Sequence, residues 1–177
     1  MKSYASLLVL AMILFPTVLT AQEKKDPAPV SSVVKLLLDR YTKNVPAAAE
    51  AMPADKYSYK PTPDQMTYAH LMVHIVEANN LLCSKITDAT EPKLELADTD
   101  SKEKLVAGVK ASFAFCAAEI AKMDESKLGD TITLLNNQRP WAIAAILLTS
   151  NWADHYGMQA IYLRLNGILP PTAQPKK

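Results

Sequence analysis

Residues 149–171 read TSNWADHYGMQAIYLRLNGILPP and place His155 in the middle of a mostly apolar helix. Asn151 precedes His155 by about one helical turn, so the two side chains lie nearly above one another on the same helix face. A carboxamide oxygen and an imidazole nitrogen directed at one point form a chelating pair. The stretch therefore predicts a central helix that carries a polar site.

A second histidine, His74, occurs in the apolar segment YAHLMVHIVEANNLLCSK, residues 68–85. If this segment is a helix that packs antiparallel to the one carrying His155, the two imidazoles reach the same place. His70 lies one turn before His74. It is either a further donor to that site or a histidine at the rim of the protein.

The first predicted helix begins at Ser31 or Ser32, either of which is a suitable N-cap, and ends near Met52. Its apolar residues recur at three- and four-residue spacings, which is typical of one buried helical face. Pro46 falls inside this pattern. Because proline removes one helical hydrogen bond and crowds the preceding turn, we expect a kink or a break near Asn44.

Two more helices follow the proline-containing stretch at residues 53–66, which we expect to be a packed loop. Thr67 is a plausible N-cap for a helix over residues 68–87. After a polar linker, Asp100 and Glu103 resemble a capping box that opens a helix over residues 101–123.

The last predicted helix begins at Pro140 and ends at Gly167. Proline suits the first turn of a helix, and glycine suits a left-handed end. Residues 124–138 are interpreted as a loop. The helix over residues 140–167 is apolar on every side near its start, which indicates a position at the centre of a bundle.

Four helices without a convincing strand predict an all-α fold, a four-helix bundle over residues 30–172 with a short tail at 173–177. The 177 residues, 49% of them hydrophobic, suffice for one domain. A net charge of +1 gives no basic field that would attract nucleic acid. The sequence contains no Ser-His-Asp arrangement, Gly-rich phosphate loop or CxxC motif. With only four glycines, nucleotide binding is not expected. A homodimer is left open.

Residues 1–21 resemble an export signal, with Lys2 at the start, a short apolar run and the small-residue end Leu19-Thr20-Ala21. We expect cleavage after Ala21 and a periplasmic or secreted bacterial protein that begins with a polar tether, residues 22–29. The alternative is an uncleaved anchor, but the apolar run is shorter than the roughly 20 residues that span a bilayer. No stable membrane span is then expected in the mature chain.

The chain has two cysteines, Cys83 and Cys116, each on the inner side of a predicted helix. An even number of cysteines in an oxidising compartment favours a disulfide. Two buried thiols packed as small hydrophobic groups are the alternative. Periodicity does not give the distance between the two Cα atoms, so both remain open.

Four strings, AMPADKYSYKPTP, HIVEANNLLCS, SFAFC and HYGMQAIYLRLNGILPP, in this order and at these separations, resemble the DinB-like superfamily of four-helix-bundle proteins. Members often hold a divalent metal with three histidines, one on the second helix and an H-x-x-x-H pair on a later one. His74 and His155 match two of them, and Asn151 stands where the middle histidine is expected. The resemblance thus implies a zinc or nickel site at His74, Asn151 and His155.

Asn151 weakens that expectation, because a neutral carboxamide oxygen is a much poorer ligand for these metals than an imidazole. His74 and His155 are alternatively two histidines hydrogen-bonded within a polar patch of the core. Glu77, Asp154 and Gln159 are close in sequence to the site. They either orient a histidine or are solvated groups on helix surfaces.

Two classes of function follow. Some relatives are metal-dependent, thiol-using transferases or isomerases, so the resemblance implies a hydrolase- or transferase-like enzyme that uses His74 and His155. The other class is an exported, non-catalytic module that binds a small molecule or a partner where relatives keep the metal. Position 151 distinguishes them, since a metal site should gain affinity from Asn151→His and a binding module should not.

Overall fold

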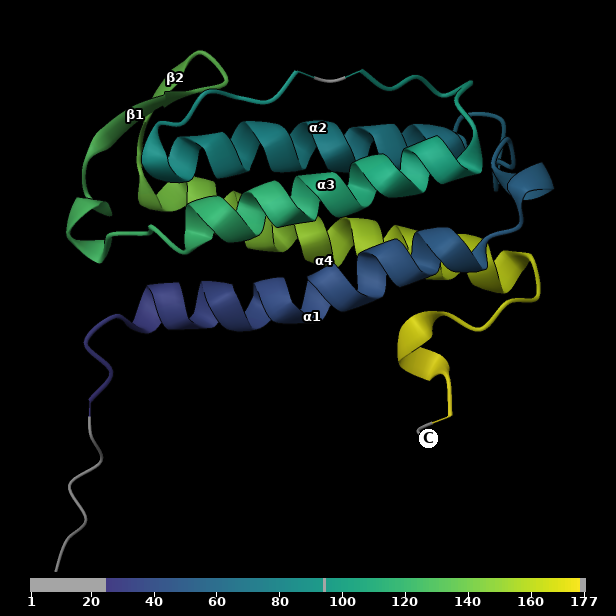
Figure 1. Ribbon diagram of the computed structural model, residues 1–177, viewed down its shortest axis with the longest axis horizontal. Coiled ribbons are helices and arrows are strands. Elements are labelled where there is room, and N and C mark those ends of the chain that lie inside the picture. Colours follow the sequence, from purple (N-terminus) through teal and green to yellow (C-terminus); the bar gives the residue numbers. More distant parts are fainter. Residues whose placement is uncertain (1–24, 94, 176–177) are drawn as a thin grey trace, which may run out of the picture.

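The computed structural model describes residues 25–93 and 95–175, and in this part of the chain four long helices form a bundle (Figure 1). They are α1 (Pro29–Ala51), α2 (Tyr68–Thr87), α3 (Lys102–Ile120) and α4 (Ala142–Leu165). Helices α1 and α4 run in one direction and α2 and α3 in the other, and the long α2–α3 connection returns along α2 (Figure 1). Each of α1 and α2 packs against both α3 and α4. The predicted all-α four-helix bundle is confirmed, whereas the predicted leader, residues 1–21, lies outside the described residues.

The core is made by apolar side chains from all four helices, with Trp152 of α4 at its centre. The Trp152 ring is 5.7 Å from the Phe113 ring of α3 and 6.1 Å from the Tyr41 ring of α1, measured between centroids. Helix α4 therefore reaches α1 and α3 through one large aromatic side chain. The predicted central position of its apolar first turns is wrong, because Ile146 is 57% exposed and Leu147 is 37% exposed.

A chain of buried polar groups crosses this core. The Trp152 indole N–H donates to Asn79 Oδ1 at 2.7 Å, and Asn79 Nδ2 donates to Ser112 Oγ at 3.0 Å. The Ser112 hydroxyl donates in turn to the carbonyl of Val109 at 2.9 Å. Because every member has a partner, the network joins α4, α2 and α3 without leaving an uncompensated polar group.

Helix α1 passes through Pro46 without a break, so of the two predicted outcomes near Asn44 the break is wrong. In Figure 1 the second half of α1 is inclined relative to the first half. Its last turn has no left-handed cap. Two of the carbonyls left unpaired there, of Ala48 and Ala49, accept hydrogen bonds from the hydroxyls of Tyr68 and Tyr57, each at 2.8 Å.

The predicted start of α2 is confirmed, since Thr67 accepts a hydrogen bond from the His70 amide as N-cap. For α3 the predicted capping residue is wrong by one position. Ser101, and not Asp100, accepts the Lys104 amide. The Asp100 carboxylate instead accepts from the Ala97 amide and the Lys104 ammonium, and α3 ends at Ile120, before the predicted Met123.

A β-hairpin occupies part of the segment that was predicted to be a loop. Strand β1 (Thr131–Leu134) pairs antiparallel with β2 (Asn137–Pro140). The two-residue turn between them, Leu135 and Asn136, has φ values of 50° and 61°, as the tight hairpin turns require. Leucine is an unusual residue in that conformation, so no turn residue of the usual kind marks the hairpin in the sequence.

The hairpin also corrects the start of the last helix, because Pro140 ends β2 and α4 begins two residues later. Its end is as predicted. Gly167 adopts a positive φ of 74°, and its amide and that of Ile168 donate to the carbonyls of Arg164 and Leu163.

Cys83 and Cys116 form a disulfide between α2 and α3, with their Cα atoms 5.1 Å apart. Of the two alternatives for the cysteines, the structure contains the disulfide. Within the described residues, none of the helices combines the length and the apolar character needed to cross a membrane.

Candidate functional site

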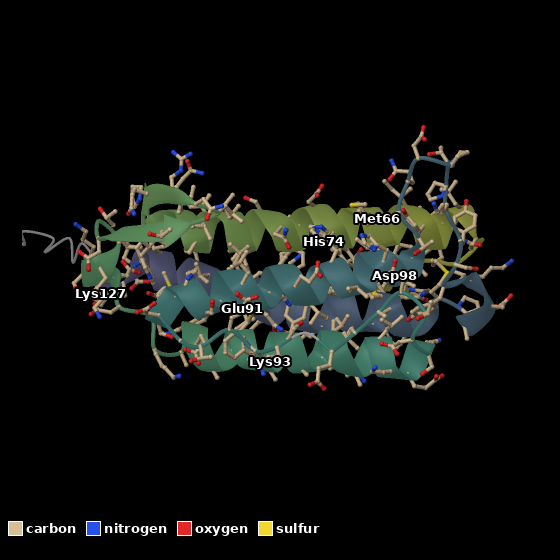
Figure 2. The ribbon with its side chains drawn as sticks, turned by 90° about the horizontal axis from the view of Figure 1, so that it is seen from above. Met66, His74, Glu91, Lys93, Asp98 and Lys127 are labelled. Atoms are coloured by element: carbon tan, nitrogen blue, oxygen red, sulfur yellow. A yellow bond between two sulfur atoms is a disulfide. The ribbon has the colours of Figure 1, made fainter. Side chains whose placement is uncertain are left out.

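Two imidazole rings meet where the middles of α2 and α4 lie side by side. The ring centroids of His74 and His155 are 4.8 Å apart, and the ring planes are inclined by 50°. Figure 2 shows His74 between these two helices. Since α2 and α4 run in opposite directions, residues near the middle of each are the ones that face each other, as the sequence led us to expect.

His155 is 6% exposed and has a defined tautomer. Its Nδ1 lies 2.6 Å from the backbone carbonyl oxygen of Asn151. A carbonyl only accepts hydrogen bonds, so Nδ1 carries a hydrogen, and in the neutral ring the lone pair is on Nε2. Histidines that bind metals are commonly held in this way, with one nitrogen donating to a carbonyl and the other free to coordinate.

His74 is less buried than its apolar surroundings in the sequence suggested, because its side chain is 41% exposed. Burial, followed by the neighbouring His155, lowers the pKa of His74, and the carboxylate of Glu77 acts in the opposite direction. The Glu77 carboxylate lies 3.8 Å from His74 Nδ1. A lowered pKa favours the neutral imidazole, which is the form that can bind a metal.

Asn151 is half-buried, and it lines the same groove as His74. His70 has a different position. Its ring is held by the Asp98 carboxylate, 2.9 Å from Nδ1, and both side chains are almost half exposed. Asp98 belongs to the α2–α3 connection (Figure 2). The structure thus places Asn151, and not His70, beside His74 on the wall of the groove.

The groove has a volume of about 840 Å³ and runs between α2 and α4 toward the hairpin. Leucines from both helices and from the hairpin turn form much of its wall, and three carboxylates also line it. The leucines are Leu81, Leu82, Leu135 and Leu147, and the acidic residues are Glu77, Glu91 and Asp154. No lysine or arginine is among the described residues that line it.

The three polar neighbours considered from the sequence have different roles. Glu77 and Asp154 are exposed groups on the groove wall. Gln159 is fully buried, and its amide donates to the carbonyl of Val45 on α1 at 3.1 Å. Gln159 therefore joins α4 to α1 within the core.

Two groove residues and one core residue were not identified from the sequence. Glu91 was part of a segment interpreted as a polar linker, and Leu135 belongs to the hairpin turn that was not predicted. Asn79, which orients the central Trp152, carried no sequence signal apart from its place in one of the resembling strings. All three acquire their roles through contacts with segments distant in the chain.

The donor set for a metal ion at this place is small. Among the residues that the structure describes, no group of three or more histidine, cysteine, aspartate or glutamate side chains is arranged to hold a metal. The two imidazoles lie close together on α2 and α4, and Asn151 is a lining residue of the groove. Such a set would bind a first-row divalent metal weakly and leave positions open to water.

Comparisons with known proteins agree with the bundle fold. In solved structures the chain resembles a DinB-like protein from Bacillus cereus ATCC 10987, with 18% identity, a TM-score of 0.66, and coverage of 79% of this chain and 95% of that one. A DinB-like protein from Bacillus subtilis has 22% identity, a TM-score of 0.62, and coverage of 83% and 99%. At these identities the likeness concerns the fold alone. A search among curated proteins found no match.

The model of the DinB superfamily matches residues 37–158, which is more than half of the chain and includes both groove helices up to Met158. The chain therefore belongs to the DinB superfamily.

Proposed function

We propose that this protein binds a divalent metal ion, zinc or nickel, through His74 and His155, with Asn151 as a weak third donor. The observation that carries the proposal is the pair of imidazoles 4.8 Å apart, one of which has its Nδ1 hydrogen engaged by a carbonyl and its Nε2 lone pair free. A hydrogen-bonded Nδ1 with a free Nε2 next to a second imidazole favours metal binding over the alternative of two histidines that only hydrogen-bond within the core.

The spacing of the rings supports one shared ion. A nitrogen bound to zinc at about 2.1 Å places the ring centre roughly 3.2 Å from the metal. Two rings around one ion then have centres less than twice that far apart, and the 4.8 Å found for His74 and His155 lies within this limit. The carboxylates of Glu77 and Asp154 on the same groove add a negative field that favours a cation.

We propose that the metal binds weakly and that its coordination sphere is incomplete. Two imidazoles and one neutral amide leave at least one position for water or a substrate oxygen, and a bound divalent ion would act there as a Lewis acid. An enzyme of hydrolase or transferase type would need that open position. The chain's own contribution is to hold the His155 tautomer, to keep His74 neutral and to exclude water on the side of the core.

Calorimetric titration of zinc and of nickel into untagged protein tests the proposal. Asn151→His should tighten binding at least about ten-fold, because an imidazole replaces a carboxamide, and His155→Ala should abolish it. His70→Ala is the matched control, since this histidine is held by Asp98 and should leave the affinity unchanged. Equal, negligible binding by wild type, Asn151→His and His155→Ala would exclude a metal site.

We also propose that the protein acts outside the cytoplasm. Support comes from the Cys83–Cys116 disulfide, a bond that persists in oxidising compartments. Intact-mass measurement of protein expressed with its full sequence provides the test. A mature chain that begins at Gln22 is expected, and retention of residues 1–21 would contradict cleavage.

A further inference from the structure

The groove between α2 and α4 has two chemically different ends. On α2 it is lined from His74 to Leu82, about 12 Å of helix, and on α4 from Asp154 back to Leu147. Because the helices run antiparallel, His74 and Asp154 share one end, while Leu82 and Leu147 share the other. The hairpin residue Leu135 also lines the groove, which leads toward β1 and β2.

The polar end of the groove is negative. Glu77 is one turn after His74 on α2, and Asp154 comes from α4. Both carboxylates are exposed, and neither is paired with a lysine or arginine among the ion pairs of the described residues. A third carboxylate, Glu91 of the α2–α3 connection, also lines the groove, but it lies farther than His74 toward Lys127 (Figure 2). The polar end, with Glu77 and Asp154, can therefore accept a positive group without displacing a lysine or an arginine.

The apolar end is formed by large side chains that remain partly in water. Leu147 is 37% exposed and Leu135 is 67% exposed. Groups of exposed apolar side chains that line a concave surface are typical of binding grooves. An aliphatic chain lying against them would remove apolar surface from water on both partners.

We propose that this groove binds an amphiphilic organic cation, with an alkylammonium head between Glu77 and Asp154 and an aliphatic tail along Leu81, Leu82 and Leu147. The positive sign of the head follows from the carboxylates, because the described residues of the groove wall include no lysine or arginine. The position of the tail follows from the leucines. An anionic amphiphile such as a fatty acid has no lysine or arginine partner among the described residues that line the groove, and it is disfavoured.

This inference does not depend on the metal site. The alkylammonium head binds carboxylates directly, so the cation should bind when all divalent metal has been removed. A metal ion at His74 and His155 would repel the positive head. Zinc should therefore weaken binding of the organic cation, and by linkage the cation should weaken zinc binding by the same factor.

The test is calorimetric titration with decyltrimethylammonium, below the concentration at which it forms micelles. The buffer contains a chelator. Decanoate is the anionic control ligand of similar tail length. The cation should bind at least about ten-fold more tightly than decanoate, because the groove field is negative. The double variant Glu77→Gln with Asp154→Asn should lose most of this preference. Comparable binding of cation and anion, or no binding of the cation, would overturn the inference.

A matched pair of variants on α4 locates the tail. Leu147→Asn should weaken cation binding about ten-fold by removing apolar contact. Ile161→Asn replaces another exposed apolar residue of α4 that does not line the groove, and it should have no effect. Equal losses in the two variants would mean adsorption to apolar surface in general and would overturn the assignment. If Leu147→Asn unfolds in thermal melts, Leu135→Asn serves as the tail-end variant.

Discussion

The disulfide between Cys83 and Cys116 cross-links α2 to α3 near the C-terminal ends of both helices. The two cysteines are 33 positions apart. In the chain-entropy model, a cross-link that closes a loop of this size lowers the conformational entropy of the unfolded state. The folded state is thereby stabilised by about 4 kcal/mol. Reduction of the wild-type protein should therefore lower the free energy of unfolding by about 4 kcal/mol.

Replacing both cysteines with alanine adds a second cost to the loss of the cross-link. Both residues are completely buried, so Cys83→Ala with Cys116→Ala leaves a small cavity in addition to the missing bond. We expect the double variant to be about 1–2 kcal/mol less stable than the reduced wild type. The difference between these two proteins measures packing, while the difference between oxidised and reduced wild type measures the cross-link.

Urea unfolding followed by circular dichroism, with and without a phosphine reductant, gives all three free energies. The double variant has no disulfide, so the reductant should not change its free energy of unfolding, and it serves as the control. A loss of less than about 1 kcal/mol on reduction of the wild type would refute the entropic reasoning. Two free thiols in denatured, unreduced protein would show that the bond is not formed.

Two further predictions concern buried and partly buried polar groups. Asn79→Ala leaves the indole N–H of Trp152 without its acceptor in the core, so it should lower the free energy of unfolding by about 3 kcal/mol. A loss below about 1 kcal/mol in urea unfolding would show that the network is not required for stability. His74 has a lowered pKa in the folded state, so the unfolded state binds its proton first, and stability should fall as pH decreases below about 6.5. His74→Gln should reduce that loss in unfolding measured from pH 7.5 to 5, and an unchanged pH dependence would contradict the assignment.

Local sequence patterns were sufficient for the helices whose ends depend on nearby residues. Helix α2 begins after its predicted cap Thr67, and the predicted left-handed Gly167 follows the end of α4, because a side-chain cap and a left-handed glycine are properties of a few adjacent positions. The hairpin could not be predicted in the same way. Its turn places Leu135 and Asn136 at positive φ without a glycine, a conformation that the rest of the protein must support.

The candidate site was partly predictable for a similar reason. Spacing along one helix related Asn151 to His155, and the resemblance to a family added His74. Periodicity indicates which face of a helix is apolar, but it does not give the depth of a residue beneath the neighbouring helix, so the exposure of His74 was not foreseen. Glu91 comes to the groove through the course of the α2–α3 connection, which no local pattern encodes.

The proposed metal site is tested most directly by nitrogen-15 NMR of the histidine rings during addition of zinc, because the chain has three histidines in all. We expect Nε2 of His155 and one ring nitrogen of His74 to shift together, while Nδ1 of His155 remains protonated through its bond to the Asn151 carbonyl. The His70 ring, held by Asp98, should not change. Zinc-dependent shifts confined to His70, or no shift at His74 and His155 at saturating zinc, would contradict a shared metal site.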